Sequence, residues 1–250
     1  LNDIEKKITK KTKAVLYVHL YGQCKDLSNL KRICSSKKIN LIEDCAQSHL
    51  SESNSGKSGS FGEFAAWSFY PTKNLGAVGD AGAITSNNLK LINKCKKIRN
   101  YGQSSRYKHV VKGVNSRMDE IQAGILYEKL DYLEIWNKKR KKIAEKYDKE
   151  LKNPKIEKLK RIKSKKDSFY LYVIKSKTRN KLISYLNKNE IKSIIHYPIL
   201  SYNQKFDFKY KKLEKCNNAE KISKTCLSIP CHPFLRKEEI NKIIKTLNEF

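Results

Sequence analysis

The chain has 250 residues, enough to bury the core of one large domain or two smaller ones. Its hydrophobic content of 39% is typical of a globular protein, and no apolar run reaches the roughly 18 residues that a membrane-spanning helix needs. The start, LNDIEKKITKK, lacks the apolar stretch of a secretory signal. We therefore expect a globular cytoplasmic protein. Because the chain begins with Leu1 rather than Met, we also expect it to be a fragment.

The net charge of +29 comes almost entirely from lysine, with 46 Lys and only 8 Arg. These lysines are spread over the whole chain, whereas base recognition relies on the planar guanidinium of Arg. No motif of a nucleic-acid-binding protein is present. We interpret the charge as a solvated surface and expect neither a specific nucleic acid nor a membrane as a partner. The charge does favour an anionic substrate.

The cysteines give no sign of a disulfide framework or a metal site. Their number is odd and no CxxC pair occurs. Structural metal sites need clustered soft ligands, so we expect no metal ion. We expect reduced thiols instead, as is usual in the cytoplasm. The seven positions are Cys24, Cys34, Cys45, Cys95, Cys216, Cys226 and Cys231.

The first elements predicted along the chain alternate between strand and helix. Residues 13–20 form a short apolar run, and residues 26–38 carry apolar positions at helical spacing. Residues 39–44 then form an apolar strand that ends in acid at Asp44. This rhythm predicts an α/β fold with a parallel sheet, in which functional residues gather at the carboxyl ends of the strands.

The middle of the chain continues this pattern. Residues 51–62 form a Ser- and Gly-rich loop, residues 64–69 a second apolar strand, and residues 79–85 a glycine-rich turn into a hairpin strand. A helix is predicted from Ile121 to about Leu151.

A smaller strand–helix–strand unit is predicted after this helix, over residues 169–174, 182–186 and 191–197. A final helix is predicted from Lys237 onward. We therefore expect a first domain over residues 1–135, then a linking helix and a small C-terminal domain over residues 136–250.

Asp44 and Lys73 are the first candidates for chemistry. Taken alone, a strand-end aspartate could be a helix cap or a magnesium ligand of the Walker B type, but no GxxxxGK[ST] loop is present. Lys73 is one lysine among 46, yet it lies between the aromatic WSFYP and the glycine-rich GAVGDAG. Such surroundings favour the neutral amine that attacks an aldehyde. Together, a carboxylate and a reactive amine match the division of labour in pyridoxal-phosphate enzymes.

Longer motifs then carry a family resemblance across almost the entire chain. The stretches IEDCAQSH and GSFGEFAAWSFYPTKNLGAVGDAGAI resemble the DegT/DnrJ/EryC1/StrS aminotransferases, as do RNYGQSSRYKHVVKGVNSRMDEIQAGIL, IHYP and CLSIPCHPFL. The resemblance implies a fold-type I, pyridoxal-5'-phosphate-dependent transferase. It implies a three-layer α/β large domain, N-terminally incomplete here, and a small α+β C-terminal domain.

The resemblance also assigns roles to individual residues. Lys73 corresponds to the catalytic lysine that holds the cofactor as a Schiff base, and Asp44 to the partner of the pyridine nitrogen. Gln47 corresponds to a residue near the 3-hydroxyl of the ring, and Ser68 to a phosphate ligand. Asn115 corresponds to an asparagine that reaches the phosphate across a homodimer interface. His19 matches a residue beside the site and receives no role; for His19 and Gln47, ordinary core or loop hydrogen bonding stays an alternative.

The implied reaction moves an amino group from L-glutamate to a nucleotide-linked keto-deoxysugar, with dTDP as carrier, for amino-sugar and cell-surface polysaccharide biosynthesis. Two departures stand out. The family's N-terminal segment, with a phosphate-binding turn and an aromatic residue that stacks on the cofactor, is missing, and Tyr170 replaces a frequent His. A dehydratase would carry His in place of Lys73, so we do not expect one. A catalytically inactive fragment that binds only cofactor or partner remains the alternative.

Overall fold

The computed structural model describes residues 2–162, 164–205 and 216–250. The chain divides into two compact units. The first comprises residues 1–137 and 162–170, and the second comprises residues 138–161 and 171–250. No helix in the described ranges is long and apolar enough to cross a membrane.

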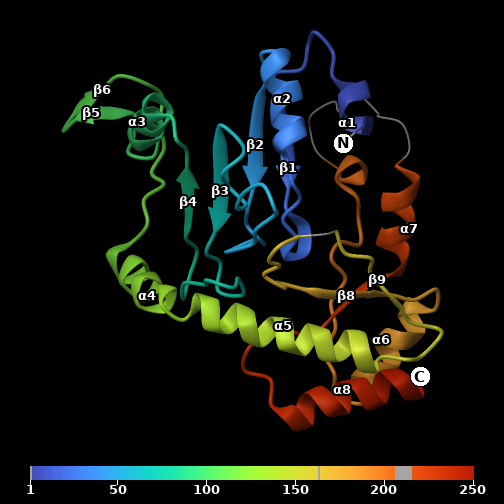
Figure 1. The fold of residues 1–250 in the computed structure, drawn as a ribbon. Coiled ribbons are helices and arrows are strands. Elements are labelled where there is room, and N and C mark those ends of the chain that lie inside the picture. The colour runs from blue at the N-terminus through green and yellow to red at the C-terminus, as the bar shows by residue number, and fades with distance from the viewer. Residues whose placement is uncertain (1, 163, 206–215) are drawn as a thin grey trace. The chain divides into compact units, whose positions relative to one another are not determined.

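A four-stranded sheet forms the centre of the first unit (Figure 1). Its strands lie in the order β1 (Ala14–Val18), β2 (Asn40–Asp44), β3 (Phe64–Ser68) and β4 (Gly82–Thr85). β1, β2 and β3 are parallel, which confirms the predicted α/β pattern, and β4 runs antiparallel to β3. The pairing of β3 with β4 begins at Ser68 and Gly82, so residues 69–81 connect the two strands. The turn predicted before β4 is therefore the end of a longer connection.

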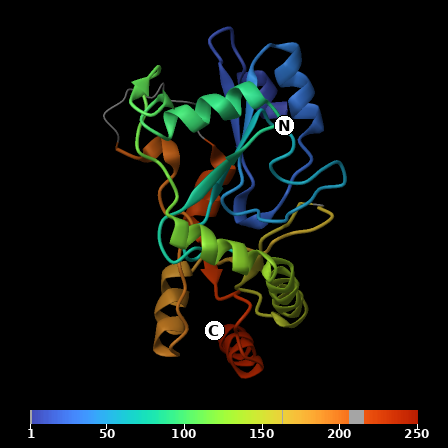
Figure 2. The same ribbon diagram turned by 90° about the vertical axis from the view of Figure 1, so that its left-hand side faces the viewer.

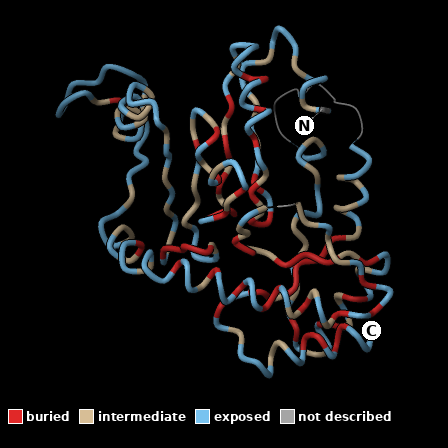
Figure 3. The backbone as a smooth tube through the Cα atoms, in the orientation of Figure 1, coloured by how far each residue is buried: buried red, intermediate tan, exposed pale blue. Residues whose placement is uncertain are grey.

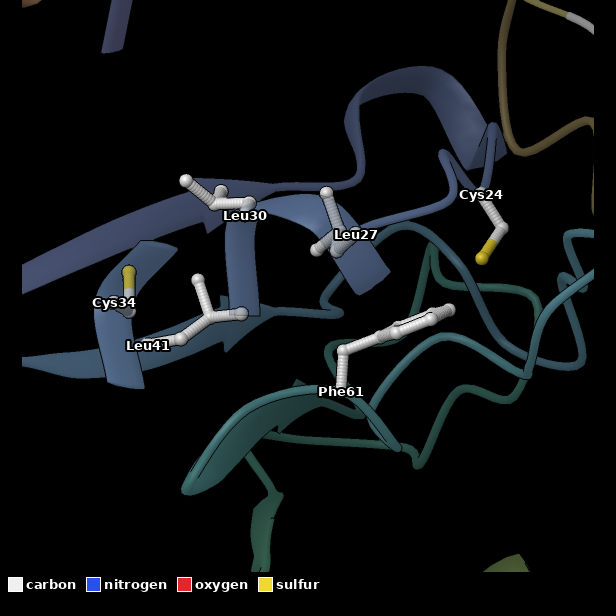
Figure 4. Packing of buried hydrophobic residues seen from close by; sticks show 6 residues of the cluster. All are labelled: Cys24, Leu27, Leu30, Cys34, Leu41 and Phe61. Carbon is white, nitrogen blue, oxygen red and sulfur yellow. The ribbon is translucent and has the colours of Figure 1, made fainter. Parts of the chain in front are cut away.

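Helix α2 (Ser28–Ser36) covers one face of this sheet, at the place where the sequence predicted a helix. Its Leu30 and the preceding Leu27 are fully buried and pack against Leu41 of β2 and Phe61 (Figure 4). Burying a leucine side chain contributes roughly 1.5–3 kcal/mol. The hydrophobic face of α2 therefore fixes the helix on the sheet.

The opposite face of the sheet is open within the described residues. Leu16 is 61% exposed and Ile84 is 51% exposed, whereas Ala65 and Leu41 on the covered side are buried. Seen from the side of β4, α2 lies on one face of the strands (Figure 2). Because strand residues alternate between faces, this difference tells the two faces apart.

The other elements of the first unit are short. They are α1 (Asn2–Lys7), η1 (Leu20–Gly22), α3 (Leu89–Ile98), β5 (Gln103–Ser105), β6 (Lys108–His109) and α4 (Glu120–Leu130). The single helix predicted from Ile121 to Leu151 is wrong, because α4 is followed by a separate helix, α5 (Leu133–Glu150). The N–H of Tyr132 donates to the carbonyl of Lys129, three residues back instead of four, so α4 closes in a tight turn.

Within its described residues, the second unit contains a three-stranded antiparallel sheet and helices of its own. The strands are β7 (Glu157–Lys158), β8 (Tyr172–Lys175) and β9 (Cys226–Ile229), and the other elements are α6 (Arg179–Lys188), η2 (Ser201–Asn203), α7 (Asn217–Thr225) and α8 (Lys237–Glu249). Almost all residues of β8 and β9 are buried (Figure 3). The helices predicted over 182–186 and from Lys237 are confirmed.

One strand predicted in this unit is wrong. Residues 191–197 form only an isolated bridge, in which Ile194 and Ser228 exchange two backbone hydrogen bonds. Pro198 follows directly and has no N–H to extend the pairing. The seven cysteines of the chain are all free thiols.

Candidate active site

The carboxyl ends of β2 and β3 place two of the expected residues on one face of the sheet. Asp44 pairs in register with Ala66, and Ser68 lies two residues further along β3. Since side chains alternate with a period of two, Asp44 and Ser68 point to the same, less covered face. Both are partly exposed. The sheet thus brings together the carboxylate and the hydroxyl that the sequence singled out separately.

The carboxylate of Asp44 has free hydrogen-bonding capacity. Its Oδ1 accepts the N–H of Ala46 at 2.9 Å, and no Lys or Arg in the described ranges forms an ion pair with it. A carboxylate can accept about four hydrogen bonds, so most of its capacity remains available for a ligand. The hydroxyl of Ser68 also has spare capacity, because among the described residues its Oγ accepts one hydrogen bond, from the N–H of Tyr70 at 3.3 Å.

Gln47 is buried and fixes the chain that leaves β1. Its Oε1 accepts the backbone N–H of Tyr21 at 2.7 Å. Tyr21 has a left-handed backbone, with φ of 62°, so this hydrogen bond holds a conformation that tyrosine rarely adopts. Gln47 therefore makes the loop hydrogen bond that was the alternative to a contact with the cofactor.

Lys73 lies in a turn directly after β3, where its N–H donates to the carbonyl of Tyr70 at 2.8 Å. The next residue, Asn74, is 3% exposed and anchors this turn. Its Nδ2 donates to Oδ1 of Asn137 and to the carbonyl of Ser168, both at 2.7 Å. Lys73 itself is partly exposed, with its Nζ 4.5 Å from the centre of the Tyr170 ring.

His49 is a buried histidine close to Lys73 that sequence reasoning did not select. Its ring is 3% exposed, and within the described residues neither ring nitrogen has a well-aligned hydrogen-bond partner. The ring packs against Trp67 and Phe69, with centroids 5.6 Å and 5.7 Å away. Burial, together with the charge of Lys73, lowers the pKa of His49 to about 4, although the nearby Ser68 backbone partly opposes this. His49 is therefore neutral at physiological pH.

His19 and Glu43 form a buried pair on the α2 side of the sheet. Nε2 of His19 lies 2.8 Å from Oε2 of Glu43, and both side chains are fully buried. Glu43 also accepts three backbone N–H groups from the loop before β3, those of Gly59, Phe61 and Gly62. Burial alone would raise the pKa of Glu43, but the hydrogen bonds from His19 and these amides hold it below its usual value.

This cluster explains His19 without a role in chemistry. Cys45 lies near enough to His19 and Glu43 for the three to resemble a metal site. However, both oxygens of Glu43 already accept two hydrogen bonds each. Burial and the neighbouring Glu43 also raise the pKa of the Cys45 thiol far above its normal value, which disfavours the thiolate that binds metals. The cluster therefore acts as a clamp between the sheet and the loop before β3. His19 has the core hydrogen bond that was the alternative to a role beside the site.

Asn115 lies away from the sheet, beside the β5–β6 hairpin. It is exposed and forms an isolated bridge with Asn100. In the described part of the chain, no contact links Asn115 to Asp44 or Lys73. An exposed position is what a residue that serves a neighbouring subunit would need.

The profile of the DegT/DnrJ/EryC1/StrS aminotransferase family matches residues 1–248. The chain belongs to this family. Its members are pyridoxal-phosphate-dependent sugar aminotransferases.

Two sequence relatives and one solved structure show the range of the family. The dTDP-3-amino-3,6-dideoxy-alpha-D-galactopyranose transaminase of Aneurinibacillus thermoaerophilus is 40% identical over 99% of this chain and 68% of its own length. The UDP-N-acetyl-3-dehydro-alpha-D-glucosamine 3-aminotransferase of Acidithiobacillus ferrooxidans is 35% identical over 96% of this chain and 65% of its own length. The structure of DesV from S. venezuelae, in complex with a ketimine intermediate, superposes with a TM-score of 0.92 at 32% identity. The match covers 98% of this chain and 67% of the DesV chain. The chain thus spans about two thirds of the length of these relatives.

The residues present fit the cofactor of the family. Asp44 offers a carboxylate with spare acceptor capacity, Ser68 a hydroxyl on the same face, and Lys73 an amine in the following turn. The burial of His49 keeps a second positive charge away from Lys73. This donor set suits a ring with a protonated nitrogen, an aldehyde and a phosphate.

Proposed function

We propose that this chain is part of a transaminase that moves an amino group from L-glutamate to a nucleotide-linked keto-deoxysugar, with dTDP as the carrier. The observation that supports it most is that Asp44 and Ser68 lie on one face of the sheet at the carboxyl ends of β2 and β3, with Lys73 in the turn that follows β3. When bound, pyridoxal phosphate takes up the amino group and draws electrons from the carbon that carries it.

Asp44 would hold the pyridine nitrogen in its protonated form. Among the described residues, its carboxylate accepts one hydrogen bond, from the N–H of Ala46. A charge-assisted hydrogen bond from a pyridinium N–H would complete its coordination. Gln47, fixed by its bond to Tyr21, would lie near the 3-hydroxyl of the ring.

Lys73 would hold the cofactor through Nζ and, once released, would move a proton between the reacting carbons as base and then as acid. The turn that carries it is well anchored, because Asn74 bonds to Asn137 and Ser168. A proton carrier on a fixed turn reaches the same point in both halves of the reaction. His49 stays neutral at working pH and so adds no repulsion that would drive the Lys73 ammonium away.

The cofactor phosphate would be bound by Ser68 of one chain and Asn115 of a second chain in a homodimer. Asn115 is exposed, and the hairpin region beside it exposes apolar side chains suited to an interface. These exposed residues include Tyr101, Tyr107, Val110, Val111 and Val114.

We infer the carrier nucleotide from the charge of the chain and from its relatives. The net charge of +29 favours a dianionic diphosphate, whichever base it carries. We favour dTDP because the relative that is 40% identical acts on a dTDP-sugar, while the UDP-sugar relative is 35% identical. Both carriers therefore belong in the test.

The test begins with capture of the cofactor. Wild type, Lys73→Ala and the surface control Lys90→Ala are mixed with pyridoxal phosphate, reduced with borohydride and digested, and the modified peptide is identified by mass spectrometry. We expect the cofactor on Lys73 in wild type and in Lys90→Ala, with a visible absorbance band that Lys73→Ala lacks. The same pattern in all three proteins would contradict the role of Lys73.

Turnover is measured next, as 2-oxoglutarate formed from L-glutamate with dTDP-linked or UDP-linked 3-keto-sugars. We expect Lys73→Ala to lower the rate by at least about a hundredfold, the loss typical of a missing general base. Capture by Lys73 without turnover on either sugar would support the alternative, a fragment that binds cofactor alone.

A further inference from the structure

Tyr170 covers the functional end of Lys73. Nζ of Lys73 lies 4.5 Å from the centroid of the Tyr170 ring, well within the roughly 6 Å over which a cation is attracted to an aromatic face. The hydroxyl of Tyr170 lies 3.4 Å from Oγ1 of Thr72, the residue before Lys73. Both the ring face and the hydroxyl of Tyr170 therefore contact the turn that carries the lysine.

The segment before Tyr170 is firmly attached to the first unit. Ser168 is fully buried, and its N–H donates to the carbonyl of Gly22 at 3.0 Å. Its Oγ donates to the carbonyl of Gln47 at 3.0 Å. Two residues before Ser168, Lys166 exchanges two backbone hydrogen bonds with Glu52, of 2.7 Å and 2.9 Å. The segment that leads to Tyr170 is therefore held by hydrogen bonds at several points.

The backbone itself is shaped to bring the ring to the lysine. Phe169 has φ of 46°, in the left-handed region that is unfavourable for a bulky residue and that persists only when its surroundings enforce it. Gly22 permits the close approach, because a Cβ there would lie 2.4 Å from Oγ of Ser168 and 3.0 Å from the N of Tyr170. A strained residue and a glycine thus meet at the point where the chain turns Tyr170 toward Lys73.

The lysine and the tyrosine are tied to each other by one side chain. Asn74, next to Lys73, donates to the carbonyl of Ser168, two residues before Tyr170. Asn137 accepts the second hydrogen of the same amide and donates to the carbonyl of His49. The turn of Lys73, the segment of Tyr170 and the backbone of His49 therefore form one hydrogen-bonded frame.

The ring of Tyr170 is also the partner that the structure gives to the charge of Lys73. Within the described residues no carboxylate lies at ion-pair distance from Lys73 Nζ, and the nearby His49 is neutral. We propose that Tyr170 is a positioning residue that docks the free ammonium group of Lys73 against its aromatic face. Resting on the function proposed above, this keeps Nζ in place while the lysine is detached from the cofactor. A carboxylate there would form a salt bridge, whereas an aromatic face attracts the ammonium without supplying a competing base.

The test compares the reactivity of Lys73 in the protein without cofactor. A pulse of acetic anhydride labels neutral amines, and mass spectrometry measures Lys73 relative to the other lysines of the same molecule. Tyr170→Leu should raise the relative labelling of Lys73 by about two- to fivefold near neutral pH, which corresponds to a cation–π contact at a partly exposed site. Tyr170→Phe should stay near wild type, because the ring face is kept. Tyr185→Leu, a partly buried tyrosine packed on Phe250, is the matched control and should leave Lys73 unchanged.

The pH dependence of labelling distinguishes two effects of the Tyr170 ring: attraction of the charged amine and steric shielding of the amine from the reagent. At alkaline pH, where amines lose their charge, the ratio between Tyr170→Leu and wild type should fall to about one. A ratio that stays the same at every pH would overturn the proposal, because it would show that the ring only blocks the reagent. If Tyr170→Leu fails to fold, p-cyanophenylalanine at position 170 keeps the shape of the ring but weakens its attraction for cations. It should then raise labelling near neutral pH, and labelling equal to wild type would equally overturn the proposal.

The outcome is independent of the test of the function itself. Labelling of Lys73 needs no cofactor, so a failed docking test leaves capture of pyridoxal phosphate by Lys73 intact. Conversely, if wild type captures no cofactor while Tyr170→Leu shows the pH-dependent ratio, the proposed function fails and the docking contact stands.

Discussion

The buried imidazole of His49 should make the stability of this chain depend on pH in the mildly acidic range. His49 has a pKa of about 4 in the folded chain, against 6.5 for an ordinary histidine. The unfolded chain therefore binds a proton at this residue between these two values while the folded chain does not. As the pH falls, protonation stabilises the unfolded state, so the free energy of unfolding decreases.

The size of the effect follows from the two pKa values. Between pH 7 and pH 5, His49 alone should lower the free energy of unfolding by about 2 kcal/mol, rising to about 3 kcal/mol by pH 4. This is large beside the roughly 5–15 kcal/mol that stabilises a typical domain. Burial is the main cause, because the ring is 3% exposed, and the charge of Lys73 adds to it.

His49→Phe is the decisive variant. It keeps an aromatic ring against Trp67 and Phe69 and removes the titrating group, and within the described residues neither ring nitrogen has a well-aligned partner to lose. Urea unfolding at several pH values should show that the difference in stability between His49→Phe and wild type grows by about 2 kcal/mol from pH 7 to pH 5. Leu126→Ala, which creates a cavity elsewhere in the first unit, is the control; it should cost about 2–5 kcal/mol at every pH.

Nuclear magnetic resonance gives the direct check. In protein with labelled histidines, the ring signal that disappears in His49→Phe should stay in its neutral position down to about pH 4. A midpoint near 6.5, or a stability difference that does not change with pH, would show that the ring is hydrated and refute the reasoning.

Two further predictions concern the frame around the site. Glu43→Ala should lower the free energy of unfolding by about 3–5 kcal/mol in urea unfolding, because it leaves His19 and three loop amides without their buried acceptor; a loss below about 1 kcal/mol would contradict the clamp. Gly113→Ala should displace the hairpin beside Asn115, because a Cβ there would lie 2.0 Å from the N of Gly102, and hydrogen exchange over residues 100–115 should speed up. Gly124→Ala, whose Cβ would meet no atom within 4 Å, should leave this exchange unchanged.

Local periodicity was enough to predict the parallel part of the sheet, because β1, α2 and β2 follow one another with the spacing that each element requires. It failed at two places that leave no period in the sequence. The turn after Leu130 interrupts an otherwise helical pattern through a local hydrogen bond from Tyr132 to Lys129. Residues 191–197 form one bridge with Ser228, a partner far along the chain.

The candidate site shows the same division. Asp44 and Lys73 could be selected from strand-end position and flanking residues, and Ser68 and Asn115 only from the family resemblance. Tyr170 was visible as a departure from the family, but its contact with Lys73 joins residues almost a hundred positions apart. His49 gave no signal, because a histidine after a strand is equally compatible with a solvated loop. The ring of His49 is buried against Trp67 of β3 and against Phe69, the residue that follows β3.

The alternation of β2 explains how a strand of five residues can stabilise one face of the sheet and present a carboxylate on the other. Leu41 and Glu43 point to the covered face, where one packs under α2 and the other clamps the loop before β3. Asp44 points to the opposite face, in register with Ala66 and near Ser68. Because the period is two, a shift of one residue would bury Asp44 and expose Glu43. The clamp of Glu43 therefore does more than stabilise the loop: it holds the register that presents Asp44 to the site. Glu43→Gln, which keeps the shape but weakens the clamp, should consequently loosen cofactor binding even though Glu43 lies on the far side of the sheet.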